Sequence, residues 1–229
     1  MGLERDTIVR TAVRLLDEVG LDKLTLRRLA AELGVQAPAL YWHFRNKQEL
    51  LDEMAEVLTV REGQALRPLA VGESWEEWLA GWFRDQRRVF NAHRDTARLA
   101  AGTHPGQGTL ATVELILESL QRAGFTPMEA MGGVGALASF TGGFVLEEQA
   151  DRERQMNDQS QLDQAFEELT PYPRLRAVLT EMGGPQSDAS FEHGLSLIIA
   201  GMRARLAEKS GSQGGDGDLA MEGVRPEGG

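Results

Sequence analysis

Residues 25–44 read Thr-Leu-Arg-Arg-Leu-Ala-Ala-Glu-Leu-Gly-Val-Gln-Ala-Pro-Ala-Leu-Tyr-Trp-His-Phe. Thr25 is a preferred N-cap for a short helix that Gly34 ends, and Pro38 fits the first turn of a further helix that we expect to run to about Phe44. An amphipathic helix ended by Gly20 comes before this stretch. Three short helices with a glycine-containing turn between the second and the third predict a tri-helical helix-turn-helix.

Helical patterning continues through the rest of the chain. Asn46 is expected to cap a fourth helix, with Glu49 as its capping-box partner. Apolar residues recur at three- and four-residue steps, and they do not alternate with polar ones as in strands. The sequence therefore predicts an all-α fold. The expected later helices begin at Ser74, at Thr109, at Pro127 (to about Gln149), at Pro171 (to Met182) and at Ser187 or Asp188.

Composition excludes several classes of function. The absence of cysteine rules out disulfides, zinc–thiolate sites and cysteine nucleophiles. We find no signal peptide and no apolar run near the roughly 20 residues that span a bilayer, so a cytoplasmic protein is expected. The net charge of −11 divides into +2 over residues 1–47 and −13 over the remainder. This asymmetry permits nucleic-acid binding at one end, although an acidic body is equally typical of any solvated helical surface.

The third helix carries more exposed aromatic surface than a helix without a partner needs. Leu40 and Phe44 should face the core, leaving the side chains between them to a DNA major groove or, alternatively, to a packed partner helix. Arg27 can reach guanine, Gln36 can read adenine, and Pro38 can pack on a thymine methyl. The DNA-binding residues predicted are Arg27, Gln36, Ala37, Pro38, Ala39, Tyr41, Trp42, His43 and Lys47.

The stretch from Thr25 to Leu51, with its Leu40-Tyr41-Trp42-His43-Phe44 core, closely resembles the tetracycline-repressor (TetR) family. The body resembles the same family, and its tetracycline repressors most, at Gly102-Thr103-His104-Pro105 and at Val145-Leu146-Glu147-Glu148-Gln149. The resemblance implies a homodimer built on the last two long helices and a ligand tunnel in each body. An intramolecular bundle in a monomer is the alternative reading of those helices.

With this resemblance the chain divides into three parts. Residues 1–47 are the expected DNA-binding domain, and residues 48–208 the expected ligand-binding and dimerisation domain. Residues 209–229 are expected to form a disordered tail, since residues 210–229 contain seven glycines and no apolar period.

The resemblance also predicts a ligand site whose polar contacts have changed. Thr103 and Glu147 match positions that hold a magnesium–drug chelate, but Ala100 stands where the family has a metal-binding histidine. Trp82 and Ile116 replace two amides, which favours an apolar or polycyclic aromatic ligand without obligatory metal, unless these side chains simply fill the core. A magnesium-chelated ligand, with His104 as a substitute, is the alternative. The ligand-binding residues predicted are Gln64 (or Gly63), Trp82, Gln86, Ala100, Thr103, His104, Ile116 and Glu147.

These features together predict a ligand-responsive repressor. We expect a homodimer that binds a palindromic operator, is released by a small-molecule inducer and controls efflux or drug-resistance genes; a transcriptional activator of the same fold is the alternative. Glu147 and His104 could form an acid–base pair. Because the sequence has no nucleophile elbow, phosphate loop or HExxH signature, we do not expect an enzyme and expect no cofactor.

Overall fold

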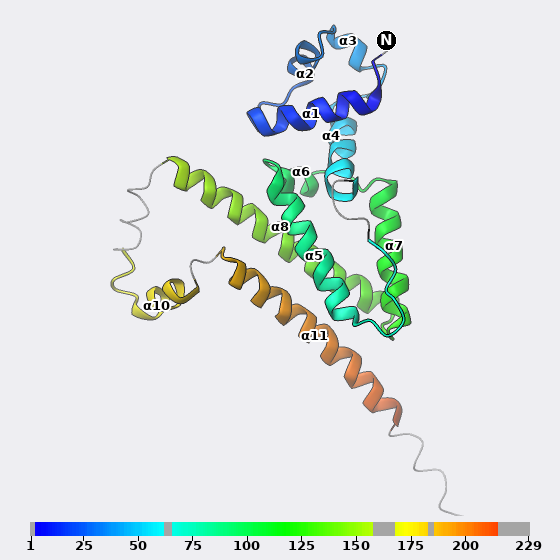
Figure 1. Cartoon of the computed structure of the whole chain (residues 1–229), viewed down its shortest axis with the longest axis vertical. Helices are drawn as coiled ribbons and strands as arrows, with labels where there is room; N and C mark the ends of the chain where they lie inside the picture. Colours follow the sequence, from blue (N-terminus) through cyan, green and yellow to red (C-terminus); the bar gives the residue numbers. More distant parts are fainter. Residues whose placement is uncertain (1–2, 62–65, 158–167, 183–185, 215–229) are drawn as a thin grey trace, which may run out of the picture.

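The computed structural model describes residues 3–61, 66–157, 168–182 and 186–214, and all regular elements in these ranges are helical. Figure 1 shows a small head of helices joined by α4 to a larger body, with α11 running along the body and beyond it. The elements are α1 (Arg5–Val19), α2 (Leu26–Glu32), α3 (Ala37–Leu40), α4 (Lys47–Glu56), η1 (Val57–Arg61), α5 (Trp75–Ala92), α6 (Thr96–Ala101), α7 (Gln107–Arg122), α8 (Pro127–Asn157), α10 (Pro173–Met182) and α11 (Asp188–Gly214).

Local hydrogen bonds set the angle between α2 and α3. The Thr25 side chain accepts from the Arg28 N–H and begins α2. At the other end, Gly34 has φ of 66°, and the N–H groups of Val35 and Gly34 donate back to Ala30 and Ala31. This is a Schellman motif, which needs a residue that tolerates left-handed backbone at the position of Gly34. The predicted helix-turn-helix is confirmed.

The third helix is shorter than predicted. α3 ends at Leu40, and residues 41–43 form turns before Phe44, whose N–H donates to the Leu40 carbonyl. The reason lies two residues further on, where Asn46 is extended so that its side chain can cap α4 at the Glu49 N–H. Helical backbone must end before such a cap. Leu40 and Phe44 are nevertheless both buried in the head core, as expected.

The body is built around α5, α8 and α11. Both long helices extend further than the sequence indicates. α8 continues to Asn157, past the predicted end at about Gln149, and α11 continues to Gly214, past the predicted start of a disordered tail at residue 209. The rest of that tail lies outside the described residues.

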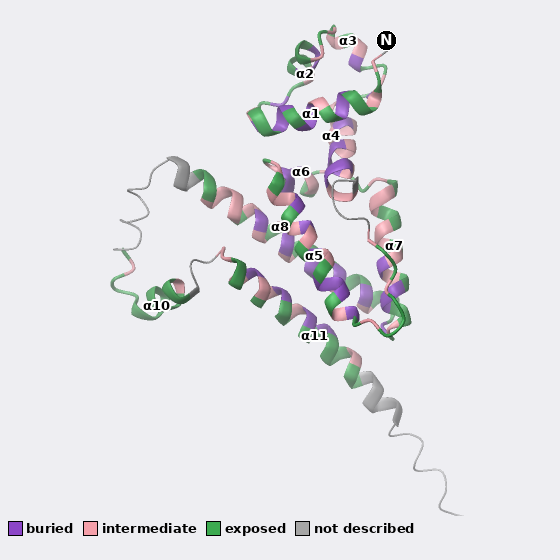
Figure 2. Cartoon of the chain, in the orientation of Figure 1, coloured by how far each residue is buried: buried purple, intermediate pink, exposed green. Residues whose placement is uncertain are grey.

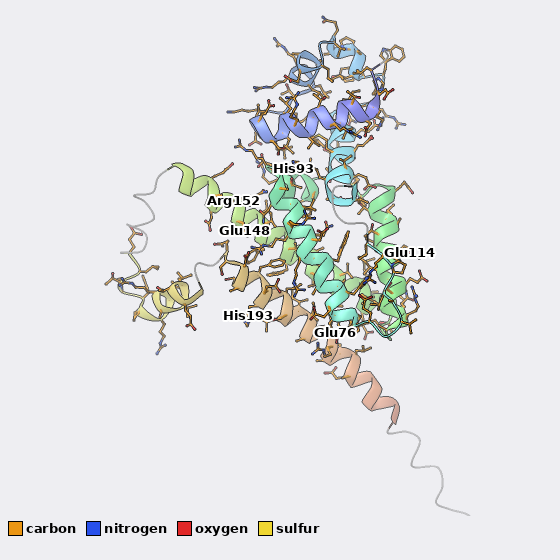
Figure 3. The ribbon with its side chains drawn as sticks, in the orientation of Figure 1. Glu76, His93, Glu114, Glu148, Arg152 and His193 are labelled. Carbon is orange, nitrogen blue, oxygen red and sulfur yellow. The ribbon has the colours of Figure 1, made fainter. Side chains whose placement is uncertain are left out.

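Arg87 joins the three body helices from the middle of α5. Its guanidinium bonds Glu148 of α8 and Asp188 of α11, and it lies 4.6 Å from the centre of the Phe191 ring. Glu148 also accepts from Asn91 at 2.7 Å, and Figure 3 shows Glu148 on α8 close to α5. Glu148 raises the pKa of Arg87, although burial opposes this. Arg87 and Glu148 are mostly buried, whereas Asp188 completes the cluster from an exposed position at the start of α11.

α8 leaves much of its apolar surface uncovered in the single chain. Residues 127–153 of α8 are long and apolar enough to cross a membrane, a property that the core helix of a soluble protein can share. Gly133 lets Met202 of α11 approach closely, whereas an added Cβ at Gly132, Gly135 or Gly143 would meet nothing within 4 Å. Close packing inside the chain therefore explains only part of the glycine content of α8. The uncovered face is the kind that a second copy would cover.

Replacement of Arg87 by methionine should lower the free energy of unfolding by about 2–4 kcal/mol, because Glu148 is then left without its main partner in a mostly buried position. Chemical denaturation at fixed protein concentration would measure this. Arg88→Met is the control, because Arg88 is exposed and should change stability by less than about 0.5 kcal/mol. Equal effects of the two substitutions would contradict the role given to Arg87.

Candidate DNA interface and ligand cavity

Most of the predicted DNA-binding residues lie on α3, beside its start or in the turn after it, whereas Arg27 lies near the start of α2 and Lys47 begins α4. Trp42 is 89% exposed and Tyr41 is 57% exposed, at the turn that follows α3. Arg27, Gln36 and Pro38 are exposed as well, and His43 and Lys47 are half-buried. Figure 2 shows α2 and α3 at the outer end of the head, away from the body. Their placement leaves this end free to meet a large partner.

Arg5 at the start of α1 fastens the turn after α3 to α4. Its guanidinium donates to the His43 carbonyl, pairs with Glu49 and Glu53 on α4, and lies 4.2 Å from the centre of the Phe44 ring. The Arg45 N–H, followed by Arg5, holds the pKa of Glu49 below its usual value. This arrangement ties the aromatic turn to the first residues of α4, so that a movement of α4 carries the turn with it.

A second set of contacts joins the head to α6. The Leu21 N–H donates to the Asp95 carboxylate at 2.8 Å, and Arg98 pairs with Asp22 at 2.9 Å. The hydrogen bond from Arg98 lowers the pKa of Asp22. Leu99 of α6 belongs to the same apolar core as α1 and α4. The head is therefore attached to the body through α6 as well as through α4.

A cavity of about 320 Å³ lies in the body directly beneath α4. Its walls come from α4 with η1, from α5, from α6 and the turn after it, from α7, and from α8. Most of the lining is apolar, including Phe83, Phe90, Val113 and Ile116. η1 is a π-helical turn, a feature frequent at functional sites, and the Thr59 carbonyl within it accepts from Gln86.

Glu56 at the end of α4 both lines the cavity and caps α7. Its carboxylate accepts the N–H of Gly108 and the N–H and hydroxyl group of Thr109, the hydroxyl at 2.6 Å. A carboxylate is favoured there because the first N–H groups of a helix have no partner within it and carry partial positive charge. Asp52, one turn earlier, accepts the His104 N–H, so that α4 also holds the turn between α6 and α7.

Six of the predicted ligand-binding residues line this cavity, namely Trp82, Gln86, Ala100, Thr103, His104 and Ile116. Glu147 does not line the cavity of its own chain and is exposed on α8. Gln64 and Gly63 lie outside the described residues. The sequence reasoning did not identify Thr59, Val60, Thr109, Thr112 or Thr141, because single threonine and valine residues in amphipathic helices carry no spacing signal that separates a cavity wall from a core.

The described residues do not offer a set of donors that suits a magnesium ion. Ala100 has no ligating atom, the Thr103 hydroxyl donates to the Ala100 carbonyl, and the imidazole of His104 is 85% exposed beside Asp52. Within the described ranges, no three histidine, aspartate or glutamate side chains come together at a possible metal position. Magnesium ordinarily keeps several waters and takes one or two protein ligands, and Ala100 supplies none at the position of the expected histidine.

Comparison with known proteins identifies the two parts of the chain. Residues 8–54 match the family model "Bacterial regulatory proteins, tetR family", and residues 67–206 match "Tetracyclin repressor-like, C-terminal domain". The chain belongs to the TetR family. As a TetR-family member it is a helix-turn-helix DNA-binding repressor that responds to a ligand and works as a homodimer, and it is not an enzyme.

Three relatives show how near this TetR-family chain lies to known regulators. It is 40% identical to the tetracycline repressor protein class A from transposon 1721 of Escherichia coli, over 89% of this chain and 92% of that one. A structure of TetR class A in complex with 5a,6-anhydrotetracycline and magnesium superposes with a TM-score of 0.67, at 35% identity, over 88% and 99% of the two chains. ActR of Streptomyces coelicolor in complex with actinorhodin gives a TM-score of 0.77, at 32% identity, over 90% and 99%.

Trp42→Ala should weaken binding to the DNA that flanks the protein's own gene by about tenfold, because Trp42 is the most exposed aromatic side chain beside α3. Fluorescence anisotropy of a labelled duplex would measure this. Tyr172→Ala removes an exposed aromatic group beside α10 and should leave the affinity unchanged. A loss of affinity in both variants, or in neither, would contradict the placement of the interface.

Glu56→Ala should lower the free energy of unfolding by about 1–2 kcal/mol, since the N–H groups at the start of α7 then lose their acceptor. Thermal or chemical denaturation would show the loss. Glu118→Ala on the same helix removes an exposed carboxylate paired with Arg122 and should have little effect. A stability change no greater for Glu56→Ala than for this control would show that the Glu56 cap of α7 does not stabilise the fold.

Proposed function

We propose that a small molecule in this cavity releases operator DNA by displacing α4. The observation that carries the proposal is that a single helix reaches both places. Lys47 begins α4 directly behind the aromatic turn, and Glu56 ends it in the cavity wall. A ligand that pushes on Glu56 or on the η1 turn would therefore change the position of the head relative to the body.

The nine sequence-predicted residues form the proposed DNA contacts. Arg27 would bind a guanine edge, Gln36 an adenine edge, and the small group around Pro38 a thymine methyl. Tyr41 and His43 would hold phosphates, and Lys47 would add charge there. Five of the nine are exposed, namely Arg27, Gln36, Pro38, Tyr41 and Trp42, and the other four are half-buried, which supports this assignment.

The proposed inducer is largely apolar, contains fused aromatic rings and needs no metal. Trp82 and Ile116 both line the cavity, whereas the histidine needed for chelation is replaced by Ala100. One relative binds a tetracycline with magnesium, and another binds actinorhodin. The lining of this chain is better suited to a polycyclic molecule that is held by shape and by a few hydrogen bonds.

Repression then follows from geometry. Two heads of a homodimer held about 34–36 Å apart would meet successive major grooves, and the operator would be palindromic. A ligand that binds the DNA-incompetent spacing about 100-fold more tightly favours release by roughly 2.7 kcal/mol. We propose residues 1–47 as the DNA-binding domain and residues 48–208 as the ligand-binding and dimerisation domain. The proposed targets are efflux or resistance genes, and the proposed localisation of the protein is the cytoplasm.

The direct test is an anisotropy titration of the full chain onto the DNA that flanks its own gene, at two salt concentrations. Because phosphate contacts release counterions, the affinity should be high and should fall steeply with salt. Absence of binding at low salt, followed by failure to select any palindrome from random duplexes, would overturn the proposed repressor.

The same assay separates the two ligand classes. Tetracycline at micromolar concentration with magnesium should leave the operator complex intact, because Ala100, Trp82 and Ile116 replace the histidine and the two amides that would hold such a chelate. The class A relative is the matched positive control under identical conditions. Release of this chain by the drug and magnesium would show that the metal-free assignment is wrong.

A further inference from the structure

Five threonine side chains line the cavity, and four of them use their hydroxyl groups within the protein. Thr59 donates to the Ala55 carbonyl, Thr112 to the Gly108 carbonyl and Thr103 to the Ala100 carbonyl, and Thr109 donates to Glu56. The fifth, Thr141 of α8, is 1% exposed, and its hydroxyl oxygen has no hydrogen-bond partner among the residues that the structure describes.

The state of Thr141 is unusual for a threonine in a helix. A helical threonine ordinarily satisfies its hydroxyl at the carbonyl three or four residues earlier, as Thr59 and Thr112 do. A buried hydroxyl without a partner is unfavourable, by an amount comparable to a lost hydrogen bond. A polar group kept in this condition on the wall of an apolar cavity is a candidate for a bond to whatever fills the cavity.

The position of Thr141 in the wall supports this role. Val134, Ala138 and Thr141 follow one another at four- and three-residue steps, so one face of α8 supplies all three to the cavity. Figure 1 shows α8 crossing the body between α5 and α7. Trp82 and Phe83 of α5 and Ile116 of α7 are apolar neighbours in the same wall. Because the Thr141 oxygen is covered in the free protein, a ligand reaches it through a rotation of this side chain about χ1.

We propose that the Thr141 hydroxyl is the hydrogen-bonding anchor of the inducer and selects fused-ring ligands that carry a hydroxyl or carbonyl group. This inference rests on the proposed ligand cavity and adds its specificity-determining residue. A neutral aromatic alcohol or ketone gains the bond and satisfies the hydroxyl. A hydrocarbon of the same shape leaves Thr141 unpartnered and is bound less tightly.

The test uses two probes of the same shape, 1-naphthol and 1-methylnaphthalene, and measures their binding to the full chain by equilibrium dialysis. The native protein should prefer 1-naphthol. Thr141→Val keeps the shape of the side chain and should lower the affinity for 1-naphthol about five- to tenfold while leaving that for 1-methylnaphthalene unchanged. Thr112→Val is the matched control, because its hydroxyl lines the same cavity but is already bonded.

A second measurement needs no ligand. Thr141→Val removes an unsatisfied buried oxygen and should raise the melting temperature of the free protein by about 2–4 °C, whereas Thr112→Val, which loses a made hydrogen bond, should not. An unchanged or lowered melting temperature for Thr141→Val would show that the hydroxyl is already satisfied and would overturn the inference.

The possible results separate this inference from the proposed function. Loss of the probe preference in Thr141→Val but not in Thr112→Val supports the anchor, whether or not the probes release operator DNA. Equal weakening for both probes, or a preference that survives the substitution, overturns the anchor. If neither probe binds the native protein, the anchor is overturned together with the aromatic ligand class. If the probes bind but do not release operator DNA, only the proposed coupling between ligand binding and DNA release is contradicted.

Discussion

Helix α4 belongs to two apolar interiors at once, and the rest of the structure depends on this sharing. Leu50 and Met54 are buried in the head core, Ala55 belongs to that core and also lines the cavity, and Glu56 lies in the cavity wall. The helix is about 15 Å long at 1.5 Å per residue. A packed helix moves as a rigid element, so a ligand bound at one end of α4 and DNA bound near its other end would both act on this helix.

α4 meets α7 and the turn before it through hydrogen bonds, whereas it meets the head through apolar packing as well as through the ion pairs of Arg5. Glu56 and Asp52 bond backbone N–H groups of α7 and of the preceding turn. Arg5 ties the start of α4 to the aromatic turn through two carboxylates and a carbonyl. Hydrogen bonds can be exchanged at little net free energy, because the released groups can bond water. Opening the head core costs more free energy, because buried apolar surface would be exposed to water. In the proposed release, the body would therefore shift while the head stays intact.

Most of the polar groups around the cavity have hydrogen-bond partners, and the Thr141 hydroxyl is the exception among the described threonines of the wall. Backbone and hydroxyl groups around it find partners within the chain, including the Thr59 carbonyl, which accepts from Gln86. Thr141 keeps an unpartnered hydroxyl in an otherwise apolar surround. Local stability given up at one position is what a binding site requires when its ligand supplies the missing bond.

The sequence by itself determined the helices and the head, because caps and turns act over three to five residues. Thr25, Gly34, Asn46 and Ser74 all have the predicted local roles. Family resemblance then located six of the cavity residues, but it also pointed to Glu147, which lies outside the cavity of its own chain.

The tertiary structure decided everything that depends on partners distant in the sequence. It placed Glu56 against Thr109, and among five chemically equivalent lining threonines it left Thr141 without a hydrogen-bond partner within the described residues. No short pattern separates Thr141 from Thr112, because whether a hydroxyl is satisfied depends on its rotamer and on atoms brought from other helices. Periodicity specifies which face of a helix is apolar, and only packing specifies what that face meets.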